Sequence, residues 1–202
     1  GHSSTERDVG EAIKSAQFAF ETWADLSLEA RVSYLQKFVD LVSDRKEEIA
    51  KVISIETGKA LWDARGEPAA MIGKLGLSIN AYNDRTGTSQ SINGTIVAKI
   101  NHKPLGVMVV FGPFNFPAHL PNGHIIPALL AGNTVVFKPS EQTPMTAEFI
   151  FKLWHEAGLP RGVINLVQGA GETGKALISH KNINGVWEKA AYWRSNYQTV
   201  LG

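Results

Sequence analysis

The chain has 202 residues, of which 44% are hydrophobic and 19% are charged, and its formal net charge at pH 7 is +1. This composition excludes a disordered, collagen-like or highly charged protein. The small net charge gives no sign of a nucleic acid or a membrane surface as the main partner. No apolar run reaches the ~18 residues that a membrane-spanning helix needs. The length predicts one domain, or one domain and a fragment of another.

Cysteine is absent from the sequence. Its absence excludes disulfide scaffolds, cysteine-ligated zinc or iron–sulfur sites and any thiol nucleophile within these 202 residues. The polar first residues, Gly1 to Ser4, show no signal-peptide core. We therefore expect a cytoplasmic protein.

Residues 1–85 are predicted to form a helical lead-in. Apolar residues recur at helical spacing over residues 8–26 and give that segment one apolar face. Ser27, followed by an acidic first turn, predicts the start of a second helix that runs unbroken to Gly58. A third helical stretch is expected over residues 63–84.

Residues 86–104 change to short β-forming pieces. The segments 89–92 and 95–100 flank the pair Asn93-Gly94. An Asn-Gly pair between two such runs is a strong signal for a β-hairpin. We expect this hairpin to form an arm.

Residues 105–186 alternate between apolar runs and helical segments. The runs 107–111, 134–137 and 163–167 predict strands that are buried on both faces. Helices are expected over 120–131, over 145–157 and from about residue 172. This alternation predicts an α/β fold with a doubly wound parallel sheet of the Rossmann-like kind.

The last stretch, residues 187–202, follows a different pattern. It holds two of the five tryptophans and two of the four tyrosines. A parallel sheet that ends before this stretch would be incomplete and would leave an apolar edge, which favours association of copies. One hypothesis is that the aromatic residues of this tail fold back on that edge; they are Trp187, Tyr192, Trp193 and Tyr197.

Three segments follow predicted strands, and ligands of open parallel sheets gather beyond the carboxyl ends of strands. The first is Gly112 to Pro117, where two prolines fix the backbone around Asn115. A rigidly held amide is able to donate to an oxygen that becomes negative during a reaction, which contributes roughly 3–4 kcal/mol in a known case. The alternative is that Asn115 only caps the following turn.

The second segment is Lys138-Pro139-Ser140-Glu141. A lysine at the end of a strand, followed by a hydroxyl and a carboxylate, is suited to contact ribose hydroxyls or a phosphate. The alternative is a weak surface ion pair between the lysine and the glutamate.

The third segment, residues 169–174, satisfies the pattern G-x-G-x-x-G between a predicted strand and a predicted helix. One interpretation is a turn that binds a pyrophosphate. The other is a glycine-rich turn that allows tight packing of the helix on the strand.

Two further polar groups are expected to be structural. His119 and His124 lie five residues apart without a matching carboxylate, so we predict packing or partner contacts and no metal site. Glu56-Thr57-Gly58-Lys59 lacks the upstream glycine of a phosphate-binding loop and is typical of a helix that ends at a glycine cap.

Together these pieces resemble the aldehyde dehydrogenase superfamily, in their order and spacing, from about residue 6 to residue 186. The motifs that carry the resemblance are Glu56 to Lys59, Pro113 to Pro117, Pro127 to Leu129, Gly132 to Glu141, Ala157 to Pro160 and Gly162 to Asn165. Within the family, some residues are most similar to an enzyme of bacterial arginine catabolism: Trp62, Met71, Lys74, Tyr82 to Gly87 and His119 to His124.

The resemblance implies an NAD-dependent oxidation of a small aldehyde to an acid. In that reaction a cysteine attacks the aldehyde, a glutamate activates water, and Asn115 would help to stabilise the oxyanion. The resemblance also implies a set of cofactor contacts. Phe111, Gly112 and Pro113 would line the cofactor cleft, Lys138, Ser140 and Glu141 would lie along the adenosine ribose, and Gly171 and Gly174 would lie near the adenine end.

The resemblance also implies a homo-oligomer, in which the hairpin of residues 86–104 pairs with another subunit. It stops near Val186, where the family continues with a phenylalanine–threonine–glycine–serine turn and this chain has Trp187-Glu188-Lys189. We therefore expect a truncated enzyme without its catalytic domain, nucleophile and general base, which is inactive alone. The alternative is a nucleotide-binding or purely structural half-enzyme that associates with itself or with a homologue.

Overall fold

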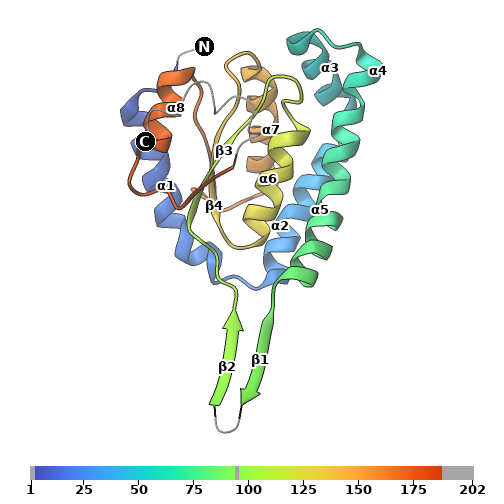
Figure 1. Cartoon of the computed structure of the whole chain (residues 1–202). Helices are drawn as coiled ribbons and strands as arrows, with labels where there is room; N and C mark the ends of the chain where they lie inside the picture. The colour runs from blue at the N-terminus through green and yellow to red at the C-terminus, as the bar shows by residue number, and fades with distance from the viewer. Residues whose placement is uncertain (1–2, 94–95, 188–202) are drawn as a thin grey trace.

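A computed structural model describes residues 3–93 and 96–187 of the chain. Its centre is a four-stranded sheet with the strand order β5-β4-β3-β6, which lies between two layers of helices (Figure 1). The strands are β3 (Val107–Phe111), β4 (Thr134–Lys138), β5 (Ile164–Leu166) and β6 (Gly185–Trp187). All neighbouring pairs are parallel. The predicted parallel sheet is therefore confirmed.

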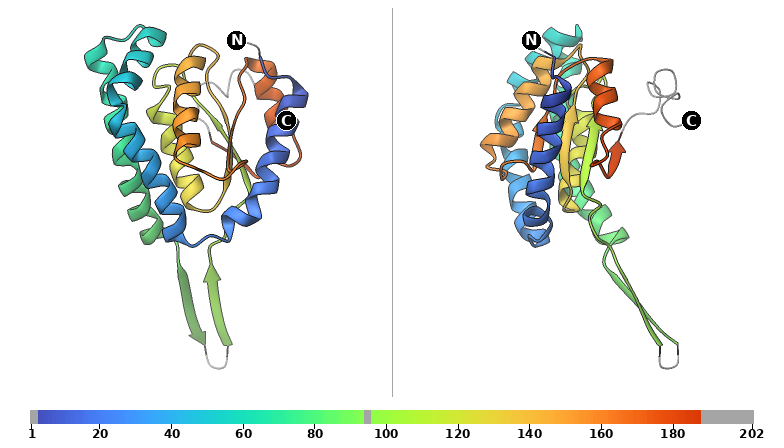
Figure 2. Two further views of the ribbon diagram at one scale, coloured as in Figure 1. Left: turned by 180° about the vertical axis from the view of Figure 1, so that it is seen from behind. Right: turned by 90° about the vertical axis from the view of Figure 1, so that its left-hand side faces the viewer.

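The two faces of the sheet are covered by different helices. In Figure 1, α1 (Glu6–Ala24) and α8 (Gly171–Ile178) lie to the left of the sheet. The other face carries α2 (Leu28–Asp44), α5 (Gly66–Arg85), α6 (His119–Leu130) and α7 (Pro144–Glu156). Figure 2 shows the same layers from two other sides. Each predicted strand–helix unit of the core is therefore present.

The sheet has a hydrophobic core on each side because successive strand residues point to opposite faces. In β3, Met108 and Val110 belong to the larger core under α2, α5, α6 and α7. Val107 and Val109 belong to the smaller core under α1 and α8. Both faces of β3 are buried, which explains its continuous apolar run.

The long helix expected from Ser27 to Gly58 is wrong in one respect, because the structure has two helices there. After α2, Arg45 leaves the helical conformation, with φ −109° and ψ 20°, and α3 (Lys46–Thr57) begins. The guanidinium of Arg45 donates two hydrogen bonds, of 3.2 and 2.6 Å, to the carboxylate of Glu156 on α7. The bend thus lets α3 pack along α7, a contact that helical periodicity does not encode.

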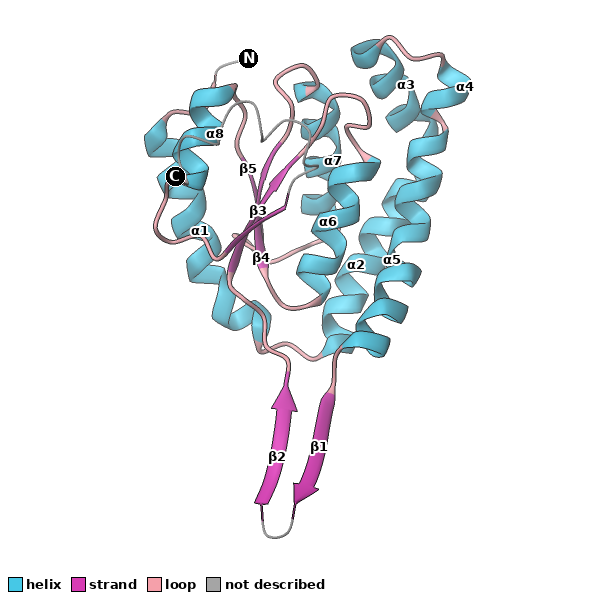
Figure 3. Ribbon diagram, in the orientation of Figure 1, coloured by secondary structure: helices cyan, strands magenta, loops and turns pink. Residues whose placement is uncertain are grey.

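The predicted hairpin is confirmed as β1 (Thr88–Asn93) and β2 (Ile96–Asn101), which pair in antiparallel fashion. It projects away from the body of the molecule (Figure 3). Residues 94–95 of the expected turn lie outside the described residues.

Three further differences concern the ends of elements. The helix expected over 63–84 is divided into the short α4 (Leu61–Ala64) and α5. Strand β6 was not expected, although it pairs with β3 across Val186 and Val109. Of the aromatic residues predicted to fold back on the sheet, Trp187 lies in β6 and pairs with Val110 of β3; Tyr192, Trp193 and Tyr197 lie outside the described part of the chain. Within residues 3–93 and 96–187, no helix has the length and apolar character needed to cross a membrane.

The packing of α2 on α7 yields a test of the larger core. The rings of Phe38 and Trp154 are stacked with centroids 3.4 Å apart, and neither side chain is more than 1% exposed. Replacing Phe38 by alanine should lower the free energy of unfolding by about 3–5 kcal/mol, because it removes a buried ring and leaves a cavity. Urea denaturation followed by circular dichroism measures the change.

The matched control is Phe18→Ala on α1, because Phe18 is 90% exposed. That change should stay within about 0.5 kcal/mol. Similar losses in both variants would contradict the packing described here.

Candidate functional site

The order of the strands shows that the chain begins the sheet at β3 and adds later strands on both sides of it. The chain proceeds from β3 to β4 to β5 on one side and then returns to the other side of β3 as β6. In open parallel sheets, ligands bind beyond the carboxyl ends of the strands at such a switch point. The loop of residues 112–117 leaves β3 at this place and carries Asn115.

Gly112 allows the ends of β3 and β4 to approach closely. Its N–H donates a hydrogen bond of 2.9 Å to the carbonyl of Lys138. A Cβ atom on Gly112 would lie 2.9 Å from the ring of Phe137 and 3.3 Å from the Cα of Pro139. Phe111 and Lys138 are direct partners in the sheet register. The structure therefore brings Phe111, Gly112 and Lys138 together.

The start of α6 is held by a buried carboxylate from another helix. Glu67 of α5 is 2% exposed. It accepts hydrogen bonds from the N–H groups of Ala118 and His119, at 3.0 and 3.1 Å. These are unpaired groups of the first helical turn, which favours negative charge. Glu67 therefore caps α6 and fixes the end of the loop that contains Asn115.

Lys59 completes this arrangement. Its ammonium group lies 3.0 Å from a carboxylate oxygen of Glu67 and 3.9 Å from the ring centroid of Phe116. The buried negative charge is thus paired, and the aromatic ring of the loop receives a cation–π contact. We call Lys59, Glu67 and Phe116, with the backbone of Ala118 and His119, the Glu67 cluster.

The carboxylate of Glu56, near the end of α3, caps α7, the helix that follows β4. Glu56 accepts hydrogen bonds from the N–H groups of Met145 and Thr146, at 2.6 and 2.8 Å. The hydroxyl of Thr146 donates to it as well, at 2.6 Å. Gly58 ends α3 with φ 75°, so the predicted glycine cap is confirmed. Glu56 and Glu67 therefore anchor the two helices whose N-termini face the candidate site.

Asn115 lies exposed in the loop. Its side chain has no hydrogen-bond partner among residues 3–93 and 96–187. The alternative that Asn115 caps the following turn is wrong, because Glu67 supplies that cap. The amide is thus open to solvent at the switch point.

Lys138 is a buried cation at the end of β4. It is 6% exposed, and its ammonium donates a hydrogen bond of 2.9 Å to the carbonyl of Pro139. A carboxylate oxygen of Glu141 lies 3.9 Å away, beyond hydrogen-bond distance. The hydroxyl of Ser140 accepts a hydrogen bond from the N–H of Gln142 at 3.2 Å. The ion pair of the alternative interpretation is thus present, but at a long distance and with its lysine buried.

The glycine-rich segment at residues 169–174 lies beyond β5. Gly169 has φ 152°, and a Cβ there would overlap the hydroxyl group of Thr173. That hydroxyl donates to the carbonyl of Ser4 at 3.1 Å, and the N–H of Ser4 donates to Gln168 at 2.6 Å. Tight packing therefore explains why residue 169 is a glycine, which agrees with the second interpretation of the motif.

The other two glycines of that motif lie on α8. Gly171 is exposed at the first position of the helix, and Gly174 is buried within it. Because α8 covers the face opposite to α6 and α7, these glycines are separated from Asn115 by the sheet.

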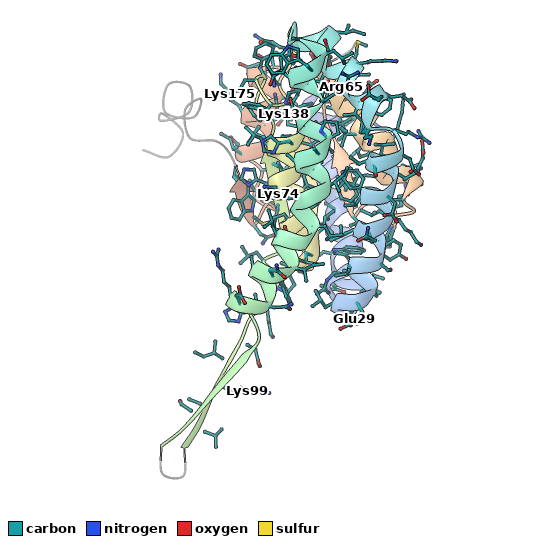
Figure 4. All side chains as sticks on the ribbon, turned by 90° about the vertical axis from the view of Figure 1, so that its right-hand side faces the viewer. Glu29, Arg65, Lys74, Lys99, Lys138 and Lys175 are labelled. Atoms are coloured by element: carbon teal, nitrogen blue, oxygen red, sulfur yellow. The ribbon has the colours of Figure 1, made fainter. Side chains whose placement is uncertain are left out.

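His124 lies on α6, which packs against α5, the helix that carries Lys74 (Figure 4). Burial of its ring, and next the positive charge of Lys74 on α5, lower its pKa below the ordinary value for histidine. Its ring stacks on that of Trp187, with centroids 5.6 Å apart. The described residues contain no group of three or more side chains that could hold a metal ion.

The helix caps escaped the sequence analysis for a physical reason. Glu67 is 51 residues away from Ala118 in the sequence, and Glu56 is 90 residues away from Thr146. No local spacing signals such partners. The signal that does exist is an acidic residue beside the apolar residues of an amphipathic helix, as at Glu67.

The first prediction for the site concerns Glu67→Gln. The amide retains the shape of the side chain but leaves the mostly buried ammonium of Lys59 without its counter-charge. Breaking a buried pair costs about 3–5 kcal/mol of the free energy of unfolding, measured by urea denaturation.

Glu47→Gln is the control, because Glu47 pairs with Arg65 at 3.0 Å while both side chains are about half exposed. It should cost at most about 1 kcal/mol. If Glu67→Gln cost no more than this control, the Glu67 cluster would not stabilise the fold.

The second prediction concerns His124. Because its pKa is lowered in the fold, the unfolded chain binds this proton more readily. The free energy of unfolding should therefore fall as pH drops below about 6.5, the ordinary value. Lys74→Met should raise the pKa of His124, yet leave it below the ordinary value because the ring stays buried.

An NMR titration of the imidazole protons measures this pKa. Lys152→Met, on exposed α7 surface, makes the same charge change away from α5 and should leave the pKa unaltered. An unchanged pKa in Lys74→Met would show that the two side chains do not interact.

Comparison with known proteins places these features in context. Residues 1–187 match the aldehyde dehydrogenase family. The chain is 53% identical over 187 residues to the N-succinylglutamate 5-semialdehyde dehydrogenase of Burkholderia ambifaria (strain MC40-6), a match that covers 93% of this chain and 38% of that protein. The chain thus spans well under half the length of this relative.

Solved structures agree with that result. The glyceraldehyde-3-phosphate dehydrogenase of Methanocaldococcus jannaschii, complexed with NADP, superposes with a TM-score of 0.87 at 27% identity, over 93% of this chain and 42% of that one. An aldehyde dehydrogenase of Bacillus cereus in complex with NAD⁺ gives a TM-score of 0.86 at 31% identity, over 91% and 38% of the two chains.

Proposed function

The chain belongs to the aldehyde dehydrogenase family, and on that premise we propose that it forms the NAD-holding part of an aldehyde oxidation. The observation that carries the proposal is the junction of β3 and β4 at the switch point. There the N–H of Gly112 donates to the carbonyl of Lys138, so the loop after β3 and the buried cation of Lys138 lie side by side. A cation beyond the carboxyl ends of parallel strands fits a cofactor that carries phosphates and riboses.

Different residues along the edge of the sheet contact different parts of the cofactor. Phe111, Gly112 and Pro113 line the cleft, and Lys138, Ser140 and Glu141 bind the adenosine ribose. Gly171 and Gly174 lie toward the adenine end. Bound NAD supplies a hydride acceptor, and the protein's share is to orient it against the aldehyde.

The side-chain amide of Asn115 donates a hydrogen bond to the reacting oxygen of the aldehyde. Its amide is exposed, lacks a partner in the described residues and lies in a loop whose end is fixed by the cap on α6. A donor held ready in this way stabilises an oxyanion without reorganising during the reaction. Asn115 is thus the group of this chain that touches the substrate at the aldehyde.

The substrate that we propose is N-succinylglutamate 5-semialdehyde, oxidised to succinylglutamate in arginine catabolism. The 53% identity to the Burkholderia enzyme supports this choice. Because the 202 residues hold no cysteine, a thiohemiacetal cannot form on them. The chain alone is therefore inactive as an aldehyde dehydrogenase.

The hairpin of residues 86–104 is proposed to join two subunits, as a region separate from the helical part (residues 1–85) and the sheet (residues 105–186). It projects from the body, and its Val97 and Ile100 are 58% and 61% exposed. An isolated two-stranded hairpin is marginally stable in water. A second copy would complete it, which sedimentation of the chain would detect.

The test of the function is a calorimetric titration of the chain with NAD. We expect micromolar affinity, and no reduction of NAD when aldehydes are added. Glu141→Gln should weaken binding about tenfold, because a charged acceptor of a ribose hydroxyl is lost.

The control is Glu148→Gln, which makes the same change on the exposed face of α7 and should bind NAD as the unaltered chain does. Absence of heat at millimolar NAD would contradict the proposal and favour a purely structural half-enzyme. Reduction of NAD with an aldehyde would contradict the proposed inactivity.

A further inference from the structure

The direction of the Asn115 amide depends on the residues beside it in the loop. Its side chain is exposed and makes no hydrogen bond with the part of the chain that the structure describes. A donor stabilises an oxyanion best when it is already held in place, because ordering a mobile side chain costs conformational entropy. Contacts of the neighbouring loop residues must therefore hold this amide.

Phe116, the residue after Asn115, connects the loop to two other parts of the molecule. The ammonium of Lys59 lies 3.9 Å from the centroid of its ring. The imidazole of His119 meets the same ring edge to face, with the centroids 5.6 Å apart and the ring planes at 83°. Both are favourable geometries for an aromatic ring. The ring is thus held between the segment that follows α3 and the first turn of α6.

Phe114, on the other side of Asn115, has no such contacts. Its side chain is 42% exposed, and it takes part in no ring stacking or cation–π contact within residues 3–93 and 96–187. Pro113 and Pro117 restrict the backbone on both sides, but they leave the dihedral angles of Asn115 itself free. The contacts of Phe116 are therefore the ones that can order Asn115.

The cation beside Phe116 is itself fixed in place. The side chain of Lys59 is 16% exposed, and its ammonium lies 3.0 Å from a carboxylate oxygen of Glu67. The carbonyl of Lys59 accepts a hydrogen bond of 2.6 Å from the hydroxyl of Ser54, and its N–H donates one of 3.3 Å to the hydroxyl of Thr57. Both the side chain and the backbone of Lys59 are anchored, so this lysine is a fixed point for the loop.

We propose that Lys59 is a positioning residue for Asn115, which it orders through the ring of Phe116. This inference rests on the proposed function and deepens it, because it names what holds the oxyanion donor. Glu67 takes part indirectly, since it orients the ammonium of Lys59. Lys59 itself touches neither the aldehyde nor the cofactor. Loss of its contact with the ring should loosen Asn115 and leave cofactor binding unchanged.

The test is a ¹⁵N relaxation measurement on the backbone and side-chain N–H groups of Asn115. The backbone order parameter should lie near the rigid value of about 0.85 in the unaltered chain and fall below about 0.6 in Phe116→Leu. Phe116→Leu removes the ring but leaves Lys59 paired with Glu67, so the fold should stay native. Phe116→Tyr keeps a ring and should restore the order.

Phe114→Leu is the matched control, because it makes the same change on the other side of Asn115, and it should leave the order parameter unaltered. Equal losses of order in Phe114→Leu and Phe116→Leu, or an unchanged Asn115 in Phe116→Leu, would overturn the inference.

Variants of Lys59 test the cation itself. Lys59→Met keeps the aliphatic stem without the charge and should loosen Asn115 as Phe116→Leu does, whereas Lys59→Arg restores a cation and should reverse much of the loss. If Lys59→Met alone does not fold, Glu67→Gln is added, so that no buried charge is left unpaired. Full order of Asn115 without the charge of Lys59, in a folded chain, would contradict the role of the lysine.

NAD titrations of the same variants separate this inference from the proposed function. Phe116→Leu should bind NAD as the unaltered chain does, because Lys138 lies on a different strand. Loss of Asn115 order in Phe116→Leu, without NAD binding by any sample, would support the positioning role and refute the cofactor role. NAD binding with an unchanged Asn115 would do the reverse.

Discussion

The architecture of the site depends on one buried interaction, the cap that Glu67 places on α6. Its carboxylate accepts the N–H groups of Ala118 and His119 and is paired with Lys59. Through this contact a helix of the N-terminal layer determines where the loop after β3 ends. Without a partner the carboxylate would be costly to bury, so the loop, the helix and the cation hold one another in place. Glu56 caps α7 in the same way. Two carboxylates that are close in the sequence, Glu56 and Glu67, therefore fix the ends of both loops at the switch point.

Much of the fold could be predicted from the sequence because its signals are local. The apolar run 107–111 coincides with β3, and the helix expected over 145–157 is α7, Pro144–Glu156. The prediction failed where distant contacts decide. Helical periodicity continues through Arg45, yet the chain bends there to reach Glu156. Strand β6 has three residues, too few to show a pattern, and it exists because β3 offers an edge.

The candidate site was predictable in position but less so in chemistry. Asn115 and Lys138 follow strands, and that placement alone pointed to the carboxyl ends of the sheet. The burial and the hydrogen-bond partners around these two side chains could not be predicted from the sequence. Lys138 is buried rather than exposed. Asn115 does not cap α6, because Glu67 accepts the hydrogen bonds of its first N–H groups.

The central claim is that ligand binds at the carboxyl ends of β3 and β4. Backbone amide shifts of the ¹⁵N-labelled chain, followed by NMR during a titration with NAD, test it most directly. The account predicts that Gly112, Lys138 and Ser140 shift, whereas Gly106 and Thr134, which lie at the amino ends of the same strands, do not. Shifts confined to the amino ends, or the absence of any shift at saturating NAD, would contradict it.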